Sequence, residues 1–358
     1  MNDSTMFTSG RIQEAMSKAR SFWLGESSEP MVSVYTQPTY RQNPDPDVLV
    51  EEACRCIRAD AASGREEILP CFWPDFGTVS TAAMWGGEII PPEGNRCIHI
   101  HPVAKSIADL ASLQAGPFEQ SDFQRGLDLY QRVCERMETD AIFIRTPDFQ
   151  GPMNTLALLV DQTDLLCALY EEPDLIHSML DRVTDVLIAT IQRFCREAGP
   201  ANVIGNIWPY VTLPADMGIC ITQDYMPLLG PEFYAEFEIP RLKRIADAFG
   251  GVFIHCCGEY ARHLPALKNG GFKIWGLEAA YPQTPVWEIH EVFGDEIAYL
   301  VGVSPDGEAV FPTIVDYARE IASRPCASAR FWFAAAPDSC DTAALRSIVK
   351  AGFGFRIP

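Results

Sequence analysis

Short apolar runs alternate with amphipathic segments along most of the chain. Eight apolar runs predict strands, and several are continuous rather than alternating, which is typical of strands buried on both faces. These runs are 32–35, 68–73, 141–146, 203–208, 251–256, 273–278, 298–303 and 330–335. Helical periodicity predicts helices between many of them, at 47–62, 122–139, 174–197, 231–249 and 313–323.

This alternation, with no break in composition, predicts an α/β fold, a single (β/α)8 barrel of the TIM type. Residues 1–30 predict a helical lead-in, and residues 31–358 the barrel domain. A doubly wound open sheet is the alternative, but no Gly-x-Gly-x-x-Gly turn opens a predicted helix. In a TIM barrel the functional side chains follow the carboxyl ends of the strands. We therefore expect the site at that end of the barrel.

Charge and composition narrow the function classes. The chain has 358 residues, of which 47% are hydrophobic, and its net charge is −20. Such a charge argues against nucleic acid or an anionic membrane as partner. No run of roughly 18 apolar residues predicts a membrane span, and the first residues lack the features of a signal peptide. The 12 cysteines do not fit a short secreted disulfide scaffold, so we expect a cytoplasmic protein.

The candidate chemistry begins at His255-Cys256-Cys257-Gly258, directly after the apolar run 251–254. Side chains alternate between the two faces of a strand. His255 and Cys257 should therefore point the same way, with Cys256 opposite. One imidazole and one thiolate at a strand end are two of the three protein ligands that a catalytic zinc site needs.

Cys340 is the candidate third ligand, because it follows the last predicted strand. Two strand ends would then bring one histidine and two cysteines together and leave one tetrahedral position open. Cys256 and Cys326 are the alternatives for this third position. A different interpretation is that these cysteines are buried thiols that bind no metal.

Further motifs accompany this pattern over roughly residues 60–355. They are Pro74-Asp75-Phe76-Gly77, Gly151-Pro152, the helix start Glu172-Pro173, Asp216-Met217-Gly218, Gly230-Pro231-Glu232-Phe233-Tyr234, Ile239-Pro240, His255-Cys256-Cys257-Gly258 and the late Cys340. In these residues the chain resembles the uroporphyrinogen decarboxylase superfamily. It is most similar to the zinc-dependent branch, the methylcobamide:thiol methyltransferases of the coenzyme M methyltransferase type.

The resemblance implies a distorted TIM barrel with Zn²⁺ bound by His255, Cys257 and Cys340. It also implies a methylcobamide (a methylated corrinoid) as methyl donor, carried by a small separate cobalamin-binding corrinoid protein, and a small thiol substrate as acceptor. A free thiol has a pKa near 8.5 and is mostly protonated at neutral pH, whereas a zinc-bound thiol is deprotonated. One neutral histidine and two thiolates balance the charge of Zn²⁺, so a bound substrate thiolate stays nucleophilic.

Other polar positions near the predicted strand ends have two interpretations each. Asp216 is a candidate catalytic residue that orients a histidine, contacts substrate or approaches the metal; the alternative is a helix cap or loop carboxylate. Glu278 is a candidate catalytic residue of the pocket or one half of a buried pair. Asn206 and Trp208 are candidates for lining the corrinoid or substrate cavity, or for closing the core.

Three other functions stay open. A uroporphyrinogen decarboxylase-like lyase is disfavoured, because such decarboxylases carry an Arg-Gln-Ala-Gly-Arg-Tyr segment, whereas residues 34–41 contain only Arg41. Corrinoid-dependent methyl transfer to tetrahydrofolate would need no zinc, since the attacking atom is an amine. A non-catalytic barrel that binds a corrinoid or tetrapyrrole would need no open zinc site.

Overall fold

The computed structural model describes residues 8–27, 29–34, 45–63, 68–74, 76–91, 98–205, 211–303, 310–335 and 341–353. The strands are β1 Met31–Val34, β2 Cys71–Phe72, β3 Ile89–Ile90, β4 His99–Ile100, β5 Phe143–Arg145, β6 Val203–Gly205, β7 Leu213–Pro214, β8 Ile219–Thr222, β9 Val252–His255, β10 Ile274–Tyr281, β11 Ala298–Val303 and β12 Arg330–Ala335. The α-helices are α1 Ser9–Leu24, α2 Pro46–Ala62, α3 Ser80–Ala83, α4 Asp122–Met137, α5 Pro152–Leu159, α6 Gln162–Glu171, α7 Pro173–Ala198, α8 Pro231–Phe233, α9 Ile239–Phe249, α10 Leu264–Asn269, α11 Val286–Phe293, α12 Ile314–Ala322 and α13 Thr342–Gly352.

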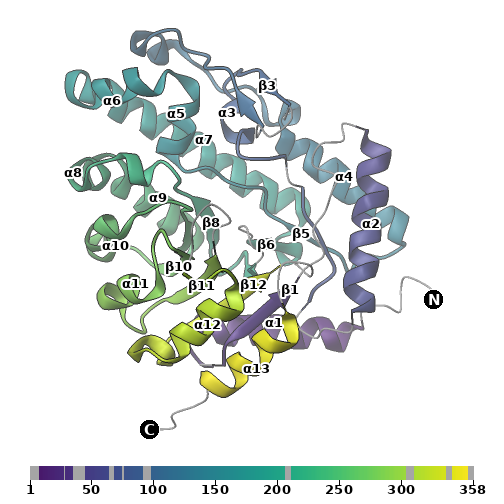
Figure 1. Cartoon of the computed structure of the whole chain (residues 1–358). Coiled ribbons are helices and arrows are strands. Elements are labelled where there is room, and N and C mark those ends of the chain that lie inside the picture. The colour runs from purple at the N-terminus through teal and green to yellow at the C-terminus, as the bar shows by residue number, and fades with distance from the viewer. Residues whose placement is uncertain are drawn as a thin grey trace.

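Parallel strands form the centre of the molecule. Six of them lie side by side in the order β1-β12-β11-β10-β9-β8, and β2, β5 and β6 form a second parallel set with the short antiparallel β7 at its edge. A parallel bridge between Gln150 and Thr222 joins the two sets. Figure 1 shows helices α8 to α13 following one another around the outside of the strands. This arrangement is that of an α/β barrel, in which each helix returns the chain to the next parallel strand.

The amino-terminal helix α1 packs beneath the barrel. Its Phe22 and Trp23 are buried in one cluster with Phe253 of β9 and Trp332 of β12. The Trp23 ring stacks on Trp332 with ring centroids 5.6 Å apart, and its Nε1 donates to the Thr212 carbonyl at 2.7 Å. Large aromatic side chains therefore fill the interior on the side of α1.

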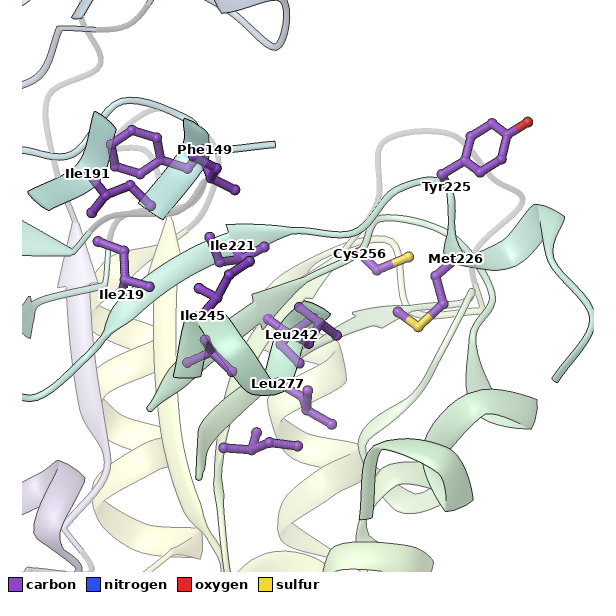
Figure 2. Close-up of a cluster of buried hydrophobic side chains, with 14 of the residues drawn as sticks. Phe149, Ile191, Ile219, Ile221, Tyr225, Met226, Leu242, Ile245, Cys256 and Leu277 are labelled. Carbon is purple, nitrogen blue, oxygen red and sulfur yellow. The ribbon is translucent and has the colours of Figure 1, made fainter. Parts of the chain in front are cut away.

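A second apolar layer separates the strands from the surrounding helices. Figure 2 shows Ile219 and Ile221 of β8 and Leu277 of β10 facing Leu242 and Ile245 of α9. Cys220, between Ile219 and Ile221 in β8, belongs instead to the interior cluster. Alternate residues of this strand therefore point outward and inward, as expected for a barrel. Among the described residues, none of the helices combines the length and apolar character that crossing a membrane would require.

All eight predicted strands are confirmed, although β2 and β5 are shorter than their apolar runs. The predicted helix 231–249 is interrupted, since a π-helix, Tyr234–Glu238, lies between α8 and α9. Strand β8 was not predicted from the sequence, because it has only four residues. This omission matters for the site, because β8 lies beside β9.

Candidate metal centre

His255 and Cys257 lie at the carboxyl end of β9, on the inner side of the barrel wall. Inward and outward positions alternate along β9, with Phe253 in the interior cluster and Ile254 in the outer layer. His255 is the last residue of the strand and is 9% exposed. Figure 2 shows Cys256 in the outer apolar layer, near Met226. The predicted alternation is therefore confirmed, and it leaves the imidazole and the Cys257 thiol on one side.

Glu278 of β10 binds the imidazole from the neighbouring strand. Ile254 pairs with Leu277, so His255 and Glu278 are next to each other in the parallel register. A carboxylate oxygen of Glu278 contacts Nδ1 of His255. A carboxylate only accepts hydrogen bonds, so Nδ1 carries a proton, and Nε2 is the nitrogen left to bind a metal once its own proton is released. This is the arrangement that orients a metal-binding histidine in many proteins.

The charges around the imidazole act in opposite directions. Burial alone would lower the pKa of His255, but the Glu278 carboxylate, the Cys257 thiol and Asp224 together raise it well above its ordinary value. His255 favours the thiolate of Cys257, but burial and the Asp224 charge outweigh this effect and raise the pKa of the thiol. In the absence of a cation, Cys257 therefore keeps its proton at neutral pH.

Asp224 is the third polar residue here, and it was not among the residues predicted from the sequence. It lies two residues beyond the end of β8, where Thr222 pairs with His255. Its Oδ1 is 3.1 Å from Sγ of Cys257 and 3.6 Å from Nε2 of His255. One ligand atom each from Asp224, His255 and Cys257 lie within 4.8 Å of one another.

The two loops that carry these residues pack closely. A Cβ on Gly258 would lie 2.4 Å from Cγ of Pro227, closer than two carbon atoms can approach. Arg262 also donates to the Pro227 carbonyl, and Thr284 Oγ1 donates to the Gly258 carbonyl at 3.1 Å. The glycine of the His-Cys-Cys-Gly motif therefore lets the Asp224 loop come within reach of Cys257.

The other predicted site residues lie elsewhere or outside the described residues. Asp216 precedes β8, so it lies toward the opposite end of the barrel from His255. Its carboxylate forms an exposed ion pair with Arg20 of α1 at 2.7 Å. This position does not support the expected role beside the metal. Cys340, Asn206 and Trp208 all lie outside the described residues.

The two alternative cysteines have apolar surroundings. Cys256 and Cys326 are 1% and 2% exposed in the outer apolar layer. Burial raises the pKa of Cys326 and raises that of Cys256 further. A thiol with a raised pKa in an apolar layer behaves as a small hydrophobic side chain. Neither position supports a role as third ligand.

The donors that the structure brings together fit a zinc ion. Imidazole nitrogen, cysteine sulfur and carboxylate oxygen are the ligand types that zinc takes in proteins. One neutral imidazole, one thiolate and one carboxylate would balance the charge of Zn²⁺. The protonated Nδ1 of His255 leaves Nε2 as the metal-binding atom. A tetrahedral zinc with these three donors would keep one position for a substrate.

Comparisons with known proteins agree with this architecture. A family model described as uroporphyrinogen decarboxylase (URO-D) matches residues 75–298. Among solved structures, a methyltransferase from Methanosarcina mazei superposes with a TM-score of 0.63 at 17% identity, covering 93% of this chain and 96% of that chain. A putative vitamin-B12 independent methionine synthase from Listeria monocytogenes gives a TM-score of only 0.41 at 16% identity, covering 96% of this chain and 93% of that chain. Curated protein sequences gave no match. The family match and the first superposition confirm the TIM barrel.

Proposed function

The chain belongs to the uroporphyrinogen decarboxylase family, and we propose that it is a zinc-dependent methyltransferase. It would move a methyl group from a methylated corrinoid, presented by a small cobalamin-binding protein, to a small thiol. The observation that carries this proposal is the pair His255 and Cys257 at the barrel mouth, with Nδ1 of His255 bound by Glu278. The fold that the chain shares with a methyltransferase supports it.

The residues of the site have separate roles in this reaction. Glu278 fixes the tautomer of His255, and Cys257 contributes negative charge. Zinc, when bound by these residues, would hold the acceptor sulfur as a thiolate. The acceptor sulfur would then attack the methyl carbon, forming a sulfur–carbon bond as the cobalt–carbon bond breaks and leaves its electron pair on the corrinoid. The thiol proton goes to solvent.

Three residues enter this proposal from the sequence alone. Cys340 is a proposed further ligand of the zinc, since it follows β12 in the chain. Asn206 and Trp208 are proposed to line the cavity for the corrinoid or the substrate. Zinc can expand to five ligands during a reaction. A further protein ligand therefore does not exclude binding of the substrate sulfur.

The test is the zinc content of the purified protein and of three cysteine variants. We expect about one zinc ion per chain in the parent, as in a single catalytic site. Cys257→Ala and Cys340→Ala should lose zinc together with methyl transfer from methylcobalamin to a panel of small thiols. Cys167→Ala is the matched control, because Cys167 is exposed on α6.

Two results would count against this function. Full zinc occupancy in both Cys257→Ala and Cys340→Ala would show that the metal binds elsewhere. A parent that is metal-free after purification without chelators would refute zinc activation. Methyl transfer to tetrahydrofolate, or decarboxylation of a porphyrinogen, by such a metal-free protein would identify the other reaction.

A further inference from the structure

We propose that Asp224 is itself a ligand of the metal bound by His255 and Cys257, and that a buried hydrogen-bond network holds it in that position. This inference rests on the proposed function, because it concerns the same metal. It adds a carboxylate oxygen to the histidine and cysteine donors. It also explains why Gln223, Glu238 and Asn154 are buried polar residues, since their hydrogen bonds hold the loop of Asp224.

The distances between the donor atoms favour coordination. Zinc bonds of about 2.0 to 2.3 Å at tetrahedral angles place neighbouring donor atoms about 3.4 to 3.6 Å apart. Oδ1 of Asp224 is 3.6 Å from Nε2 of His255 and 3.1 Å from Sγ of Cys257. Both distances from Oδ1 are therefore close to those between neighbouring donors in a zinc tetrahedron. In the metal-free protein the Cys257 thiol donates its proton to this oxygen. A zinc ion that displaced the proton would offset the repulsion between the resulting thiolate and the carboxylate.

The orientation of the Asp224 carboxylate is fixed from the Cys257 side. The backbone N–H of Cys257 donates to the same Oδ1 at 2.9 Å. This bond keeps the oxygen beside the thiol, and the side chain of Asp224 is 32% exposed. The carboxylate therefore remains accessible to an incoming ion while its direction is set.

The residues on either side of Asp224 are held by buried amide and carboxylate groups. Nε2 of Gln223 donates to Glu238 at 2.7 Å, and the backbone N–H of Gln223 donates to the His255 carbonyl at 2.7 Å. On the other side, the backbone N–H of Tyr225 donates to Oδ1 of Asn154 at 2.9 Å. Asn154 in turn donates to Gln150 at 2.7 Å.

The polar groups of this network are buried at a cost in free energy, so their hydrogen-bond partners indicate what the network positions. Gln223, Asn154 and Glu238 are 1%, 5% and 0% exposed. Burying such polar groups is unfavourable unless each finds a partner. Here Glu238 accepts from Gln223 and Asn154 accepts from Tyr225, the two residues that flank Asp224. The result is a rigid loop that presents one carboxylate at a fixed place, as a preorganised metal site requires.

The deciding experiment is the zinc dissociation constant of Asp224→Asn, measured by competition with a chromophoric chelator. Asparagine keeps an oxygen that accepts the Cys257 N–H but removes the anionic ligand. We expect the dissociation constant to rise by at least about 100-fold, the upper end for residues that only orient a ligand. Asp216→Asn is the matched control and should bind zinc like the parent, because Asp216 lies toward the other end of the barrel.

Asp224→Glu provides a second measurement, and it decides the question if Asp224→Asn fails to fold, as judged by circular dichroism. Glutamate keeps the carboxylate on a longer side chain, so its zinc affinity should exceed that of Asp224→Ala. Parent-like zinc affinity in Asp224→Asn, or equal affinities for Asp224→Glu and Asp224→Ala, would overturn the inference. In either case the zinc content of the parent and of Cys257→Ala still tests the proposed function independently. A parent that binds no zinc refutes the proposed function instead.

Discussion

His255 uses its two ring nitrogens for different purposes. Nδ1 contacts Glu278, whereas Nε2 faces Asp224 across 3.6 Å. A histidine whose tautomer is fixed in this way loses little freedom when it binds a metal. Glu278 itself is 5% exposed, so its carboxylate is satisfied mainly by the imidazole. The sequence left open whether Glu278 belongs to the pocket or to a buried pair. Both are true, because Glu278 forms a buried pair with His255, which is itself a residue of the site.

At this scale we predict that Glu278→Gln weakens zinc binding by roughly 10- to 100-fold. Glutamine still accepts a hydrogen bond from Nδ1–H but brings no negative charge to hold the proton there. The measurement is the zinc dissociation constant by chelator competition. Glu296→Gln is the control, since Glu296 is exposed and pairs with Lys268. Equal affinities for the parent and Glu278→Gln would show that the carboxylate does not orient the ligand.

Among the elements, the π-helix Tyr234–Glu238 has the clearest connection to the site. It brings Glu238 against the start of α5, where Gly151 provides no side-chain cap. Oε2 of Glu238 accepts the N–H of Met153 at 3.2 Å, and Oε1 accepts from Gln223. An anion is favourable at the amino end of a helix, where backbone N–H groups lack partners. The same carboxylate thus caps α5 and anchors the Asp224 loop.

The pKa of Glu238 yields a prediction about stability and pH. Burial raises this pKa from 4.5 to about 7, despite the hydrogen bonds from Gln223 and Met153 and the nearby Arg241. Between these two values the folded protein holds a proton that the unfolded chain has released. Stability therefore falls as the pH rises from about 4.5 through about 7. The expected loss is about 3 kcal/mol for a shift of this size.

Urea denaturation of the parent and Glu238→Gln near pH 5 and near pH 8 measures this loss. Glutamine does not titrate, so the variant should lack this part of the pH dependence, and the difference between the two proteins isolates Glu238. An identical pH dependence in both would contradict the raised pKa.

The whole molecule is a barrel whose two ends contain different kinds of side chain. Aromatic side chains from α1, β9 and β12 occupy the end near the amino-terminal helix. Polar side chains gather at the other end, where the strands terminate. Stability and chemistry are therefore separated along the barrel axis, as is general for this fold.

This separation predicts that Trp23→Ala destabilises the protein without changing the metal site. The ring is 1% exposed and stacks on Trp332, so its removal leaves a cavity and should cost about 3 to 5 kcal/mol. Denaturant unfolding measures this change, and chelator competition should give an unchanged zinc affinity. Trp23→Phe, which retains an aromatic ring, should cost less. A large loss of zinc affinity in a folded Trp23→Ala protein would contradict the separation.

The sequence was sufficient for the barrel and for half of the described site. Continuous apolar runs identify buried parallel strands, and strand alternation places His255 and Cys257 together. Asp224 was missed because Ile219-Cys220-Ile221 is too short to be recognised as a strand by its pattern. Asp216 does follow a strand, β7, but this strand is antiparallel to β6, so its carboxyl end lies at the opposite end of the barrel from His255. Applying the same strand-end rule after Thr222 would have identified Asp224.

The contacts of Glu278 could not be predicted in the same way. Pairing it with His255 requires the register of β9 against β10, which shifts between Ile274 and Gly276. A one-residue shift in register turns every later side chain to the other face of a strand. Cys340, Asn206 and Trp208 lie outside the described residues and stay predictions.

The packing of α1 under the barrel has a consequence for how the chain folds during its synthesis. The helix contacts the last strand, and Arg330 of β12 donates to the Phe22 carbonyl, 308 residues away in sequence. A ribosome makes proteins from the amino terminus at about 5 to 20 residues per second. Phe22 and Trp23 are therefore made long before Trp332 exists, and they stay without their native partner during that interval. Helix α1 is therefore made well before β12, yet it is among the last elements to reach its final position.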